Sequence, residues 1–181
     1  MFKIKEEELQ LKFTQKDIHL SQNYPLSSLK LFKEVSKEAL PLIAQFLEIK
    51  SFDRIGNRII YLFPTKNLEE AENVVKNTGL LNIPDHKINL FDGGLHEPHI
   101  RFKIQNENYG YAFNVSTISR ILNVELPKPL KVDSSELITN AVSIDVDYYT
   151  RKAVDLSIID FEEIINKVQK DLKHNLPKLL S

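Results

Sequence analysis

Residues 99 to 116 constrain the fold more than any other stretch, because apolar and polar side chains alternate there along two arms. The apolar positions are Ile100, Phe102 and Ile104 in the first arm and Tyr111, Phe113 and Val115 in the second. A period of two places each set on one face of a β-sheet. A turn centred on residues 107 and 108 sets the register, which pairs Ile104 with Tyr111, Phe102 with Phe113 and Ile100 with Val115. Such pairs stabilise an antiparallel ladder, so the sequence predicts a β-hairpin.

The same alternation predicts further strands on both sides of this hairpin. Near the N-terminus a second hairpin pairs Phe13 with Ile18 and Leu11 with Leu20. Single strands are predicted at residues 51–63, 88–91 and 138–149. In the last of these an apolar row consists of Val142, Ile144 and Val146.

Three stretches have the apolar spacing of an amphipathic helix. The first begins after a capping serine, Ser27 or Ser28, and buries residues as far as Phe46, with an interruption or kink at Pro41. A short helix covers residues 67–77, and a last helix follows a capping box at 157–160 and buries Phe161 to Leu176. Helices between runs of antiparallel strands predict a single α+β domain over residues 1–181. We expect a curved, mainly antiparallel sheet on which two long amphipathic helices and one short helix pack.

Composition narrows the classes of partner and chemistry. Lys and Arg number 24 against 25 Asp and Glu, so net charge predicts neither a nucleic acid nor an anionic membrane as the main partner. The chain has no cysteine, which excludes disulfides, thiolate zinc sites and cysteine nucleophiles. The charged N-terminus lacks the apolar core of a signal peptide, and no apolar run approaches the ~20 residues that span a bilayer. We therefore expect a cytoplasmic protein.

Two arginines are the first candidates for binding a ligand. Arg54 and Arg58 lie on the same face of the strand predicted at 51–63, on either side of Gly56. Glycine permits close approach of another molecule, and paired guanidinium groups can hold a carboxylate or a phosphate. The alternative is that both arginines form salt bridges to Asp145 and Asp147 on a neighbouring strand, with no ligand.

Two aspartates are the second candidates. Asp145 and Asp147 share the strand face opposite the apolar row, and two carboxylates can bind a divalent cation or act as an acid/base pair. The alternative is a solvated strand face. The sequence offers no further oxygen ligand at a diagnostic spacing, so we predict no metal site.

The remaining motifs predict no catalytic residue and no cofactor. His96 and His99 flank Pro98, which prevents the helical spacing typical of catalytic zinc sites, so we interpret them as loop histidines. The sequence contains no glycine-rich phosphate loop and no Gly-x-Ser-x-Gly elbow. An enzyme is therefore less favoured than a binding protein.

Four segments in order resemble a sporadically distributed family of bacterial proteins of unknown function. They are Gln10-Leu11-Lys12-Phe13 with Ile18, Tyr24-Pro25 before a helix, Arg54-Ile55-Gly56-Asn57-Arg58-Ile59, and Ser143-Ile144-Asp145-Val146-Asp147 before an amphipathic helix. The resemblance implies a bacterial or phage origin and a shared fold. It implies no reaction.

Two functions follow from these observations. The first is a non-enzymatic binding or assembly protein that acts through protein–protein contacts, with another copy of itself as the expected partner. The second is a small-anion or nucleotide-binding protein, or a weak hydrolase, that uses Arg54 and Arg58 as an anion clamp and Asp145 and Asp147 as base or metal ligands.

Overall fold

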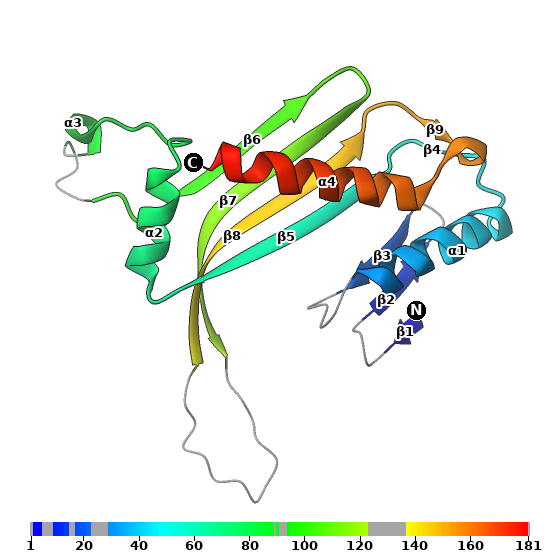
Figure 1. Ribbon diagram of the computed structural model, residues 1–181, viewed down its shortest axis with the longest axis horizontal. Coiled ribbons are helices and arrows are strands. Elements are labelled where there is room, and N and C mark those ends of the chain that lie inside the picture. The colour runs from blue at the N-terminus through cyan, green and yellow to red at the C-terminus, as the bar shows by residue number, and fades with distance from the viewer. Residues whose placement is uncertain are drawn as a thin grey trace, which may run out of the picture. The chain divides into compact units, whose positions relative to one another are not determined.

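The computed structural model describes residues 2–4, 9–14, 17–22, 29–88, 90, 94–122 and 137–180 (Figure 1). The chain divides into two compact units. The first unit comprises Met1–Asn57 and Tyr149–Leu172, and the second comprises Arg58–Tyr148 and Lys173–Ser181. Helices and antiparallel strands occur in both, so the α+β fold class is confirmed.

The first unit contains a three-stranded antiparallel sheet in the order β1-β2-β3. Its strands are β1 (Phe2–Ile4), β2 (Leu9–Phe13) and β3 (Ile18–Gln22). The register pairs Phe13 with Ile18 and Leu11 with Leu20, as the sequence predicts. β1 pairs antiparallel with β2 and was not predicted from the sequence.

Helix α1 (Lys30–Phe46) follows β3 and includes Pro41. Its buried residues are Ser36 and Ala44, whereas the side chain of Phe46 is 83% exposed. The prediction that Phe46 is buried is therefore wrong, because two residues from Ala44 is about 200° around a helix. The predicted caps, Ser27 and Ser28, lie outside the described residues, and Leu29 at the N-cap position makes no side-chain cap.

The strand predicted at 51–63 is two strands. β4 (Ser51–Phe52) pairs with β9 (Val154–Asp155), and β5 (Gly56–Thr65) begins after a break. At the break Ile55 donates its N–H to the Thr150 hydroxyl at 3.0 Å and accepts the Thr150 N–H at 2.9 Å. β5 continues through Pro64, which the prediction placed outside the strand. Proline is tolerated there because its missing N–H can face the edge of a sheet.

The second unit contains a four-stranded sheet in the order β5-β8-β7-β6. β6 (His99–Gln105) and β7 (Tyr109–Leu122) form the predicted hairpin, with every predicted pair in register. The turn is held by the side chain of Asn106, which accepts the N–H groups of Asn108 and Tyr109. Neighbouring strands of this sheet run in opposite directions (Figure 1).

β8 (Leu137–Thr150) covers the strand predicted at 138–149 and supplies the core. Val142, Ile144 and Val146 are all buried, which confirms the apolar row. On the same face, the rings of Phe102 and Phe113 stack with centroids 4.9 Å apart.

Helices α2 and α3 lie between β5 and β6 in the chain. In α2 (Leu68–Asn77), which packs against β7, the Asn67 side chain accepts the Glu70 N–H at 2.8 Å and caps the helix. Beyond its end Gly79 has a φ of 69°, the left-handed conformation that commonly ends a helix. α3 (Asp85–Ile88) corrects the strand predicted at 88–91, because Ile88 ends a helix. Residues 89 and 91 of that prediction lie outside the described residues.

Helix α4 (Phe161–Leu179) ends the described chain. Its buried side consists of Ile165, Val168, Leu172 and Leu176. The capping box predicted at Ser157 is wrong in detail: Asp160 caps α4 by accepting the Glu163 N–H, while Asp155 accepts the Ser157 N–H at the start of the 3₁₀ turn η2 (Leu156–Ile158). Among the helices that the structure describes, none has the length and apolar content to cross a membrane.

Candidate functional site

Arg58 of β5 and Asp145 of β8 form a bidentate ion pair on one face of the four-stranded sheet. The Arg58 Nε donates to Oδ1 of Asp145 at 2.8 Å, and Nη2 donates to Oδ2 at 2.5 Å. The Arg58 side chain is 63% exposed, whereas that of Asp145 is 14% exposed. This parallel geometry is the strongest form of an arginine–carboxylate contact. The guanidinium that sequence analysis proposed as an anion clamp thus already holds a carboxylate of its own sheet.

Asp147 contributes to the same cluster. The hydrogen bond to Asp145 is the main cause that raises the pKa of Arg58 above its ordinary value, and the negative charges of Asp145 and Asp147 raise it further. Partial burial of Arg58 acts in the opposite direction. Arg58 therefore stays charged at every pH at which the protein is studied.

Arg54 does not lie on β5 but in the break that precedes it. Its guanidinium lies over the ring of Tyr149, 5.0 Å from the ring centroid, within the first unit. Such a cation–π contact helps to hold the side chain in place. Of the four predicted ligand-binding residues, Arg58 and Asp145 meet directly, and the charge of Asp147 acts on Arg58. Arg54 contacts Tyr149.

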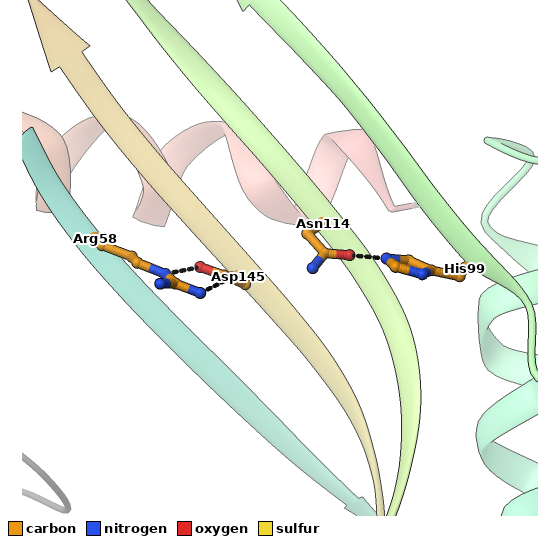
Figure 2. Close-up of polar contacts among 4 residues, drawn as sticks. All are labelled: Arg58, His99, Asn114 and Asp145. Carbon is orange, nitrogen blue, oxygen red and sulfur yellow. Dashed lines mark hydrogen bonds and ion pairs between the residues drawn. The ribbon is translucent and has the colours of Figure 1, made fainter.

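A polar row crosses all four strands of this sheet. Figure 2 shows its members, Arg58 on β5, Asp145 on β8, Asn114 on β7 and His99 on β6. The ring Nε2 of His99 is hydrogen bonded to the side-chain oxygen of Asn114. His99 is thus a strand residue with a side-chain partner, not a loop histidine.

A second polar cluster, which sequence analysis missed, surrounds Glu72 of α2. Its buried carboxylate accepts the N–H of Glu97 at 2.8 Å and lies 3.6 Å from the ring of His96 and 3.7 Å from Lys76. The Glu97 hydrogen bond is the main cause that lowers the pKa of Glu72 below its ordinary value. Glu97 has a φ of 46°, and this backbone is held by the bond to Glu72. The cluster anchors the segment before β6 to α2.

These groups do not form a recognisable reaction centre. Within the ranges that the structure describes, no three His, Asp or Glu side chains are placed to hold a metal ion. One hollow of about 310 Å³ lies beside β7 and is lined by Leu68, Glu97, Thr117, Ile118 and Ser119. Another of about 460 Å³, in the first unit, is lined by Pro41 and Gln45 of α1, by residues 48–50 that follow the helix, and by Leu156. Neither contains a member of the polar row.

The two edge strands of the four-stranded sheet differ in character. On β5 the side chains of Ile60 and Leu62, on the same sheet face as Arg58, are 53% and 44% exposed. On β6 the exposed residues Arg101 and Lys103 alternate along the strand, and Lys103 precedes the exposed Ile104. Charged residues, lysine above all, are the usual protection of an edge strand against pairing. β6 has this protection, and the middle of β5 does not.

Comparison of the chain with protein families, with curated proteins and with solved structures gave no match.

Proposed function

We propose that the chain is a non-enzymatic binding protein that assembles with other copies of itself through the edge of β5. The observation that carries this proposal is a ten-residue edge strand whose middle is apolar and exposed. An exposed edge strand offers unpaired N–H and C=O groups to a partner strand, and apolar side chains on it add contact area.

The ion pair between Arg58 and Asp145 supports this proposal over the anion-binding alternative. A phosphate or carboxylate that approached Arg58 would have to displace a bidentate carboxylate at 2.5 and 2.8 Å. The cost of stripping Asp145 of its partner opposes that exchange, because the Asp145 side chain is largely buried. The pair instead stiffens β5 against β8, which prepares the edge for pairing.

The sequence supports a proposal for the origin of the protein and for the compartment in which it acts. The resemblance to a bacterial family implies a bacterial or phage origin, and a chain without cysteine suits a reducing compartment such as the cytoplasm. A short strand contact belongs with transient interfaces, so assembly depends on protein concentration.

Sedimentation velocity with matched variants tests the proposal. The average mass of the wild-type protein should rise between about 1 µM and about 1 mM, the range of transient contacts. Ile60→Lys adds a charge in the middle of the β5 edge and should keep the protein monomeric, whereas Lys103→Glu on β6 should leave association unchanged. A wild-type protein that stays monomeric, or an Ile60→Lys variant that associates equally well, contradicts the proposal.

A thermal-shift screen tests the alternative directly. We expect phosphate, ATP and Mg²⁺ to leave the melting temperature unchanged. A specific stabilisation that disappears in Arg58→Gln would favour the anion-binding function instead.

A further inference from the structure

Resting on the proposed function, we infer that two copies pair β5 with β5 in one antiparallel register, with a two-fold axis at Ile60. The four-stranded sheets of the two copies then form one continuous sheet. The inference rests on the direction of the β5 backbone groups, on Pro64 and on the charge of Arg58.

The backbone groups of β5 alternate between β8 and the edge. Ile55 accepts the N–H of Thr150, so this residue pairs with β8. In an antiparallel strand, the backbone N–H and C=O groups of every second residue face the same neighbouring strand. The amides of residues 57, 59, 61 and 63 therefore face β8, and those of Arg58, Ile60 and Leu62 face the edge.

Pro64 supports the same assignment independently. It lies within β5, and a proline within a strand is tolerated where its missing N–H faces the edge. Its even number places it with Arg58, Ile60 and Leu62. A partner strand therefore finds no N–H donor at Pro64. The part of the edge that can form complete hydrogen-bonded pairs is centred on Ile60.

A two-fold axis between antiparallel copies of β5 pairs residues whose backbone groups face the edge with residues of the same kind. This leaves few possible registers. With the axis at Ile60, Ile60 pairs with its own copy and Arg58 pairs with Leu62 of the second copy, so the inner pairs make about six hydrogen bonds. With the axis at Tyr61, Arg58 pairs with Pro64, and each such pair lacks one hydrogen bond. The axis at Ile60 keeps every inner bond.

Charge disfavours the register that is shifted the other way. With the axis at Ile59, the two copies of Arg58 are diagonal neighbours about 7–8 Å apart, where like charges repel. With the axis at Ile60 they are separated by four residues, about 13 Å along the strand. The aliphatic stem of each Arg58 then covers Leu62 of the second copy, while its guanidinium keeps Asp145. The two Ile60 side chains meet at the centre.

Cysteine cross-linking identifies the register, and the natural absence of cysteine makes it unambiguous. In the inferred register the two copies of residue 60 have Cα atoms about 5.5 Å apart, within the range that a disulfide spans. Ile60→Cys should therefore give a covalent dimer on a non-reducing gel after mild oxidation with diamide. Leu62→Cys is the matched control, because Leu62 is 44% exposed and Ile60 is 53% exposed. It should stay monomeric, because its two copies are about 13 Å apart.

Each other outcome has a definite meaning. A cross-link in Leu62→Cys alone, or one that forms only when the Ile60→Cys and Leu62→Cys proteins are mixed, overturns the register and leaves the proposed function intact. No cross-link in either variant, with association that Ile60→Lys still abolishes, means that β5 binds another element of the partner, and this overturns the inference alone. Association that Ile60→Lys does not abolish overturns both.

Discussion

Removing the two partners of the Arg58–Asp145 ion pair one at a time should cost unequal amounts of stability. Arg58→Gln leaves the carboxylate of Asp145, 14% exposed, with Asp147 two residues away on the same face. Loss of a charged hydrogen-bond partner at such a site costs about 2 kcal/mol. Asp145→Asn leaves an arginine that is 63% exposed and still attracted by Asp147. That change should cost about 0.5–1 kcal/mol, as for exposed pairs.

Urea unfolding of the wild type, both single variants and the double variant closes a double-mutant cycle. It should be run at low protein concentration, so that association does not contribute. We expect a coupling energy of about 1 kcal/mol, which falls in 1 M salt because the exposed end is screened. Equal losses of unfolding free energy for the two single variants, or a coupling energy near zero, would refute this argument. The argument is that removing the partner of the more buried Asp145 destabilises the fold more than removing the partner of the exposed Arg58.

Three further predictions concern stability. The Glu97 N–H holds the pKa of the Glu72 carboxyl below its ordinary value of 4.5, so the ionised carboxylate stabilises the fold above that value and this stabilisation is lost as the pH falls through the lower folded-state pKa. The difference in melting temperature between wild type and Glu72→Gln should therefore narrow from about pH 6 to about pH 3. A difference that stays constant with pH would contradict this assignment. Ile144→Ala should lower the free energy of unfolding in urea by about 3 kcal/mol, because Ile144 is buried. Ile60→Ala, at an exposed position, should lower it by less than about 0.5 kcal/mol. Similar losses for the two variants would mean that Ile60 is covered. Asn67→Ala should cost about 1 kcal/mol by removing the cap of α2, and Asn67→Asp, which keeps the acceptor, should restore most of it.

Local patterns predicted the strands well. The hairpin of β6 and β7 and that of β2 and β3 formed in the predicted registers, because alternation and a short turn determine both. The break between β4 and β5 was not predictable in this way. It depends on Ile55 binding Thr150, 95 residues away, and on β4 pairing with β9.

The buried face of α1 was harder to predict for a related reason. Hydrophobicity favoured a stripe that includes Phe46, but the helix buries the small residues Ser36 and Ala44 instead. Which side of a helix is buried depends on its neighbours in space, and the spacing of apolar residues is only a guide.

The candidate site was partly predictable. Sequence analysis named a salt bridge between the arginines and the aspartates as one of two alternatives, and Arg58 with Asp145 is such a pair. Arg54 was misplaced because the strand was drawn too long. Glu72 was not singled out from the sequence, because its partner is the backbone N–H of a residue in a distant loop. No residue type signals that contact.

Amide hydrogen exchange tests most directly whether the β5 edge is where this protein acts. In dilute protein the amides of Arg58, Ile60 and Leu62 should exchange quickly, and those of Ile59 and Tyr61 should be protected by β8. In concentrated protein the first three should become protected while the other two stay as they were. Edge amides that exchange at the same rate at every concentration would contradict the account.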